Sequence, residues 1–232
     1  MQVSANKRFS SNSNLRFSYT FSKVLTGATS DRSNAPQNFY DRSADYARAT
    51  FDRTHVASIN YVYQIPYKKK NVIIGGWQLS GILAFNSGLP VRVTSGLGLD
   101  WAGLGYLGTS AVSPRPDLVS DPNTNAPHTL AKWFNTEAFA PVPTGQLRPG
   151  NAAATTVIGP GAQRLDLSMF KNVTLHERLR LQVRFETFNT LNHTNFQSIS
   201  TSFPGSNVVS TFGQVTSTRD ARKVQIAMKL TF

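Results

Sequence analysis

The sequence predicts an all-β fold, a portion of an antiparallel transmembrane β-barrel with roughly seven meandering strands. Three observations lead to this prediction. Apolar and polar residues alternate in segments of about ten residues, short and long connections alternate between the segments, and aromatic residues gather near segment ends. Side chains alternate between the two faces of a strand, so each segment has one apolar and one polar face. Such segments suit a wall with lipid outside and water inside.

The alternation is clearest in the last segment, Arg222–Phe232. Its apolar row consists of Val224, Ile226, Met228, Leu230 and Phe232. About eleven residues at ~3.3 Å each, tilted by ~45°, cross ~25 Å of hydrocarbon. We therefore expect this segment to be the barrel-closing strand. The apolar row with its aromatic end resembles the signal read by the barrel assembly machinery, which makes that machinery an expected partner.

The other predicted strands show the same pattern. They are Met1–Phe9, Leu15–Ser22, Ala57–Ile65, Trp77–Asn86, Arg164–Met169 and Leu179–Glu186. On their apolar rows Lys7 is the only charged residue, and near a periplasmic end its ammonium group can reach the interface. The polar row that contains Arg180, Arg184 and Glu186 is too charged for a dry interior. This row should therefore face water.

The connections between the predicted strands come in two sizes. The short ones are Ser10–Asn14, Pro66–Gly76 and His176–Arg178, and the long ones are Leu25–Thr50, Pro90–Gly161 and roughly Thr187–Ala221. Bacterial outer-membrane barrels have short periplasmic turns and long extracellular loops. Closed bacterial barrels also have an even number of strands, so seven strands predict a part of a larger barrel.

The beginning of the chain also predicts a part of a larger protein. Met1–Phe9 reads as a strand and not as a signal peptide, because it lacks a charged region followed by an apolar one. We expect a C-terminal piece of a longer protein, or a misassigned start codon. The partners of this piece would be outer-membrane lipid and the missing N-terminal strands.

Composition excludes several other classes. The 232 residues have a mean hydropathy of -0.26 and contain no apolar run of ~18 residues, which excludes a transmembrane helix. Cysteine is absent, so disulfides and thiolate metal sites are excluded. The formal charge of +12 does not form a basic stripe interleaved with aromatic residues, so no nucleic-acid partner is expected. The charge fits lumen solvation with solvated turns, or a basic pore that favours anionic solutes.

No arrangement of residues indicates catalysis, a cofactor or a metal. Gly103–Gly108 has the spacing of a dinucleotide-binding loop, but the prolines that follow exclude the required helix. The four histidines show no ligand spacing, and no serine lies in a nucleophile elbow. His193 lies in the segment Asn189–Phe196, where Asn and Thr favour local hydrogen bonds, so a structural role is expected.

Ten short blocks in order resemble one family. They are Gln2–Phe9, Tyr19–Lys23, Gly75–Gly81, Asn86–Pro90, Arg115–Leu118, Trp133–Phe139, Gly159–Gly161, Leu165–Lys171, Phe188–Phe196 and Gly213–Asp220. Together they resemble the C-terminal barrel region of Oar-like TonB-dependent outer-membrane receptors. The resemblance implies a ~22-stranded barrel in a Gram-negative outer membrane, with a plug that is not part of this chain. It also implies that the TonB system acts only through that plug.

The leading functional hypothesis is a transporter wall that supplies lumen residues and external loops for uptake of an unknown ligand. The loop from Pro90 to Gly161 is the best binding candidate, because loops of that length are usually functional or disordered. Its possible ligand contacts are Trp101, Tyr106, Trp133, Phe134 and Phe139, whose rings would stack on a carbohydrate or peptide, or pack within the loop. The alternatives are a secreted β-sandwich that mediates adhesion or binds carbohydrate, and an enzyme, which the sequence does not support.

Overall fold

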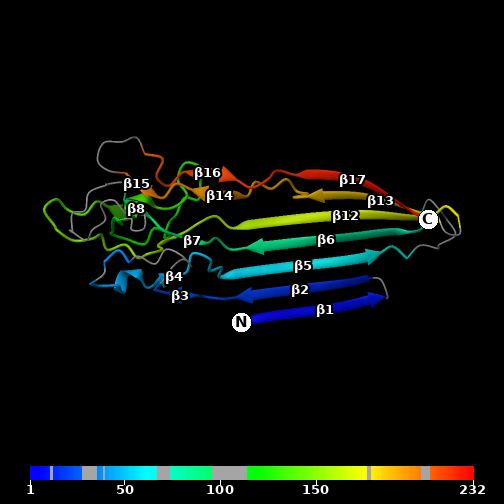
Figure 1. Cartoon of the computed structure of the whole chain (residues 1–232), viewed down its shortest axis with the longest axis horizontal. Coiled ribbons are helices and arrows are strands. Elements are labelled where there is room, and N and C mark those ends of the chain that lie inside the picture. Colours follow the sequence, from blue (N-terminus) through cyan, green and yellow to red (C-terminus); the bar gives the residue numbers. More distant parts are fainter. Residues whose placement is uncertain are drawn as a thin grey trace.

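The chain folds around one antiparallel sheet of seven long strands (Figure 1). The computed structural model describes residues 1–10, 13–27, 36–38, 40–66, 74–95, 114–176, 179–204 and 210–232. The strands are β1 (Gln2–Ser10), β2 (Ser13–Phe21), β5 (His55–Gln64), β6 (Trp77–Asn86), β12 (Ala162–Thr174), β13 (Arg180–Phe188) and β17 (Lys223–Thr231). Their order across the sheet is their order along the chain, which makes the sheet a meander. The predicted fold class and strand number are confirmed.

The register of the sheet keeps apolar residues opposite apolar ones. Met169 on β12 lies between Leu79 of β6 and Phe185 of β13. The adjacent residue, Ser168, lies between Ser80 and Glu186 on the other face. A slip of one residue would exchange the two faces, so the alternation of the sequence fixes the register.

The apolar face of the sheet is open. Ile226 and Met228 of β17 are 68% and 75% exposed, and Phe85 and Phe185 on inner strands are also exposed. Among the described residues, every buried hydrophobic side chain lies outside the seven strands. A β-sandwich would bury this face against a second sheet. The sandwich alternative is therefore wrong.

One prediction about this face needs correction. Strand β12 continues to Thr174, beyond the predicted end at Met169, and this adds Lys171 to the apolar rows as a second charged residue besides Lys7. The Lys171 side chain is buried, where its ammonium group donates to the Gly75 carbonyl and lies 4.9 Å from the Trp77 ring centre. A hydrogen bond and a cation–π contact at the strand end offset the cost of a charge there.

The three long connections gather at one end of the sheet (Figure 1). We call their described residues, within 22–54, 87–161 and 189–222, the loop cap. The cap contains short strands: β3 (Leu25–Thr26), β4 (Ala47–Arg48), β7 (Pro90–Val91), β8 (Thr94–Ser95), β9 (Asp117–Leu118), β10 (Phe139–Ala140), β11 (Val157–Ile158), β14 (Phe196–Ile199), β15 (Ser202–Phe203) and β16 (Val215–Thr218). It also contains two 3-10 turns, η1 (Ser43–Asp45) and η2 (Thr136–Ala138). Within the described ranges, no helix has the length and apolar character needed to cross a membrane.

The loop cap has its own hydrophobic core. The buried residues of this core are Val93, Phe134, Ala138, Phe139, Ala152, Val157 and Phe203. They come from two different connections, which β8 and β15 also join by a parallel pairing. The third connection is held by Arg115, whose buried guanidinium donates to Asp45 at 2.8 Å. The cap is therefore a packed unit and not a set of separate loops.

Candidate functional site

A hollow lies on the polar face of the sheet, where the sheet meets the loop cap. Its volume is about 690 Å³, within the ~300–1,000 Å³ range of small-molecule sites. The walls come from the polar rows of β6 and β12, the end of β13, and the connections before β5 and β17. Its charged residues are Arg53, Arg164, Asp166, Arg219, Asp220 and Lys223.

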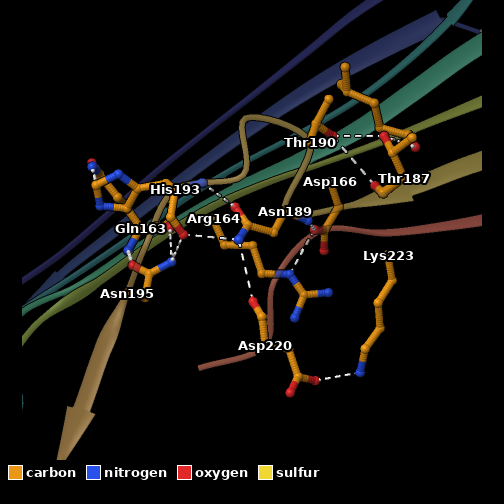
Figure 2. A network of polar contacts seen from close by, with 11 residues as sticks. Gln163, Arg164, Asp166, Thr187, Asn189, Thr190, His193, Asn195, Asp220 and Lys223 are labelled. Atoms are coloured by element: carbon orange, nitrogen blue, oxygen red, sulfur yellow. Dashed lines mark hydrogen bonds and ion pairs between the residues drawn. The ribbon is translucent and has the colours of Figure 1, made fainter. Parts of the chain in front are cut away.

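Asn189 organises the wall of this hollow (Figure 2). It follows β13 with a φ of 53°, a left-handed conformation that Asn tolerates better than most residues. Its side-chain oxygen accepts from the His193 backbone N–H at 3.0 Å, and its amide donates to the His193 carbonyl at 3.0 Å. The Asn189 backbone N–H donates to Asp166 at 2.8 Å. The Asn189 side chain thus closes the turn, and its backbone N–H ties the turn to β12.

Asn195 extends the sheet beyond the end of the β12–β13 pairing. Its side-chain oxygen accepts from the Gln163 backbone N–H, and its amide donates to the Gln163 carbonyl, both at 2.8 Å. The amide group therefore replaces a neighbouring strand at this position. His193 contacts the Gln163 side chain at 3.0 Å. Within the described residues, these contacts give His193 the structural role that the sequence favours.

Charge around the hollow is arranged in pairs. Arg164 Nε donates to Asp166 at 2.7 Å, and the Lys223 ammonium group lies 2.5 Å from Asp220. Lys223 holds the pKa of the Asp220 carboxyl below its usual value, with a smaller contribution from Arg164. Both acids are therefore compensated by neighbouring cations. Among the ion pairs of the described residues, none includes Arg53 or Arg219.

The aromatic residues predicted as ligand contacts divide into two groups. Trp101 and Tyr106 lie outside the described residues, as does the Gly103–Gly108 segment. Phe134 is 1% exposed and Phe139 is also buried, because both rings pack edge-on against each other and against Phe212. Their faces are occupied by the core of the loop cap, which is the packing alternative that the sequence left open.

Trp133 is neither fully buried nor fully exposed. Its side chain is partly buried against the cap core, and its indole N–H donates to the Ile158 carbonyl at 3.0 Å. The ring also contacts His128 and Phe196. The buried end of this side chain anchors it, so Trp133 serves the packing of the cap as well as its surface.

The predicted apolar row of the last strand is present as expected. Val224, Ile226, Met228 and Leu230 share one face of β17, and their side chains are all exposed, as is Phe232. They are not brought near the hollow, whose contribution from β17 is Lys223 on the opposite face. The row and the hollow therefore lie on two separate surfaces of the sheet.

Sequence reasoning missed most of the hollow. Arg53, Arg219 and Asp220 lie in connections without periodicity, so no pattern places them near β12. The one available signal was the Asn-rich segment after β13, because Asn recurs where backbone turns need side-chain hydrogen bonds. Among the described residues, no three His, Cys, Asp or Glu side chains lie close enough to hold a metal ion.

An open apolar face, a polar opposite face and a cap at one end are the features of a barrel wall. Comparison with protein families agrees, since the model of the outer membrane beta barrel domain matches residues 1–225. The chain belongs to the outer membrane beta barrel domain family. This family membership places the protein in the outer membrane. No curated protein and no solved structure matches the chain.

Proposed function

We propose that this outer membrane beta barrel domain is the C-terminal part of the wall of an Oar-like TonB-dependent receptor. In this role it contributes lumen and external-loop surface to the uptake of a ligand. The observation that carries the proposal is the hollow between the polar face and the loop cap. A site at the mouth of a barrel lies where a solute first leaves the medium. The ten sequence blocks that resemble Oar-like receptors add support.

The edges of the sheet indicate what completes the wall. Six antiparallel pairings separate β1 from β17, so these two edge strands run in the same direction. A second copy of the seven strands would meet this sheet with parallel edges, whereas membrane barrels of this type are antiparallel. An antiparallel closure needs an odd number of further strands. We assign these strands and the plug to the same receptor, with the TonB system acting through the plug.

The two faces of the wall suit two environments. The exposed apolar row would contact outer-membrane lipid, and the polar row would face the lumen. Strand β17 would also be the element read by the barrel assembly machinery, since it presents an unbroken apolar row that ends at Phe232. The packed cap supports ligand capture, because a rigid mouth loses less entropy on binding than mobile loops do.

Uptake can be tested without knowing the ligand. We compare cells with and without the encoding gene, each with and without TonB, and follow depletion of the medium by mass spectrometry. The proposal expects at least one compound to be depleted only when the gene and TonB are both present. Depletion that is unchanged by loss of TonB, or by loss of the gene, would refute the receptor role.

A further inference from the structure

We propose that the hollow at the mouth binds a small anionic ligand through carboxylate or phosphate groups, with Arg53 and Arg219 as its principal contacts. The inference rests on the proposed function and adds the chemical class of the solute. It starts from the charge balance of the hollow. Four cationic side chains, Arg53, Arg164, Arg219 and Lys223, line the hollow together with two carboxylates, Asp166 and Asp220.

The two carboxylates are already engaged by the protein. Asp166 accepts from Arg164 at 2.7 Å and from the Asn189 N–H at 2.8 Å. Asp220 pairs with Lys223. These contacts consume the charge of Arg164 and Lys223 and leave an excess of two positive charges in the hollow. A neutral or cationic ligand would leave that excess uncompensated, whereas an anion would neutralise it.

Arg53 and Arg219 are placed to serve such an anion. Arg53 donates one N–H to the Ser87 carbonyl at 2.8 Å, which fixes the guanidinium and leaves its charge without a carboxylate partner among the described ion pairs. Arg219 is exposed at the hollow, and its backbone N–H is held by the Asn195 carbonyl at 2.8 Å. The planar fork of a guanidinium matches carboxylate and phosphate groups in a bidentate geometry.

The floor of the hollow leaves room for the body of the ligand. The apolar part of the hollow's lining consists of the small side chains of Ala84, Ala162 and Ala221 and the larger ones of Ile82 and Phe188. Arg164 lies 5.7 Å from the Phe188 ring centre, and Figure 2 shows its guanidinium between Asp166 and the Asp220–Lys223 pair. Asp166 thus holds Arg164 against one wall of the hollow.

The rest of the polar face continues the same charge. Arg16 on β2, Arg184 on β13 and Lys229 on β17 share the face that holds the hollow, and Glu186 is an acid beside them. A surface of one predominant sign raises the local concentration of the opposite ion. The path below the hollow therefore favours the same class of solute as the hollow itself.

The test titrates the protein, extracted from outer membranes in detergent, with citrate and with pyrophosphate, using sucrose as an uncharged probe. Calorimetry should detect binding of at least one anion, none of sucrose, and weaker binding at high salt. The double variant R53Q/R219Q should bind about tenfold or more weakly, because it loses the charge-assisted hydrogen bonds of both guanidinium groups to the anion. The two anions separate a carboxylate preference from a phosphate preference.

The matched control is Arg16→Gln, which removes a cation from the same face outside the hollow and should weaken binding far less than R53Q/R219Q does. Heat-modifiable migration of each variant shows that the barrel is intact. The inference is overturned if neither anion binds, if R53Q/R219Q binds as tightly as the parent, or if Arg16→Gln weakens binding equally. TonB-dependent uptake that persists in any of these cases would leave the receptor role standing and remove only the anionic ligand.

Discussion

At the scale of single residues, the loop cap depends on a few polar side chains that replace backbone pairing. Asn189 and Asn195 close a turn and extend a strand, and Asp117 does comparable work elsewhere in the cap. Asp117 accepts from the Arg148 guanidinium at 2.7 and 2.6 Å and from the Asn151 N–H at 3.0 Å. These bonds, chiefly that from Arg148, hold the pKa of the Asp117 carboxyl below its usual value of 3.8.

The lowered pKa of Asp117 predicts how cap stability depends on pH. A carboxylate with a lowered pKa stabilises the folded state above the pKa of the unfolded chain, and this stabilisation is lost as pH falls through the lower folded value. Asp117→Asn should therefore destabilise the cap by about 1–2 kcal/mol at neutral pH, since the pair is partly exposed. Hydrogen exchange of peptides from residues 114–161 measures the loss.

The same variant supplies its own control at low pH. The difference between Asp117→Asn and the parent should shrink as pH falls below 3.8, because the parent loses its charged pair there. A difference that stays constant from neutral to acidic pH would show that the pair contributes through packing and not through charge.

At the scale of elements, the sheet and the loop cap are stabilised by different means. Backbone pairing joins the seven strands, whose apolar face suits lipid and whose polar face suits water. Buried aromatic contacts stabilise the cap instead. Phe134 is only 1% exposed, and its ring centre lies 5.9 Å from that of Phe139 and 5.1 Å from that of Phe212, both in edge-on contacts. The two parts should therefore respond independently to substitution.

Phe134→Ala tests this independence. Removal of a buried phenyl ring costs about 3–5 kcal/mol, so exchange protection in residues 114–161 should fall sharply. The barrel should still migrate in its heat-modifiable form, and peptides from β5 and β6 should keep their protection. Loss of protection in both parts would show that the cap and the sheet unfold together.

The apolar row of β17 gives a second prediction at this scale. Ile226 lies in the middle of the strand, where an arginine facing lipid costs about 2–4 kcal/mol. Ile226→Arg should lower the free energy of unfolding in lipid vesicles by that amount. Gln225→Arg, on the adjacent residue of the polar face and opposite Glu186, should cost little. Equal losses in the two variants would contradict the assignment of faces.

Phe232 tests the proposed reading of β17 by the assembly machinery. The side chain is 96% exposed, so its truncation removes almost no packing within the chain. We predict that Phe232→Ala reduces the amount of heat-modifiable protein in the outer membrane. Phe21→Ala, which truncates an exposed aromatic residue at the end of β2, should have a smaller effect. Equal amounts of assembled protein would remove the claim for Phe232.

The sequence predicted the long strands and not the cap, for a physical reason. A period of two persists over nine residues in strands such as β2 and β17, so solvent on both faces leaves a clear pattern. The strands of the cap, such as β7 and β11, pair over only two residues, which is too short for a period. The cap core joins Val93, Phe134 and Phe203, and their contact depends on how two connections pack.

At the scale of the whole molecule, one sheet separates two solvents. Its apolar face is exposed because no second layer of the described chain covers it. Its polar face carries the hollow and the excess of positive charge. Part of the formal charge of +12, which composition alone could not interpret, lies on this polar face and in its hollow. The lipid-facing assignment of the apolar row therefore underlies both the wall and the proposed site.

The most direct test of this assignment is spin-label scanning of β17 in lipid vesicles. The chain contains no cysteine, so a single cysteine can be placed at each position from 223 to 231 without a background signal. We predict that labels at 224, 226, 228 and 230 are most accessible to oxygen, which concentrates in lipid, and that labels at 223, 225, 227 and 229 are most accessible to a water-soluble nickel reagent. Uniform accessibility along the strand, or the opposite alternation, would contradict the account.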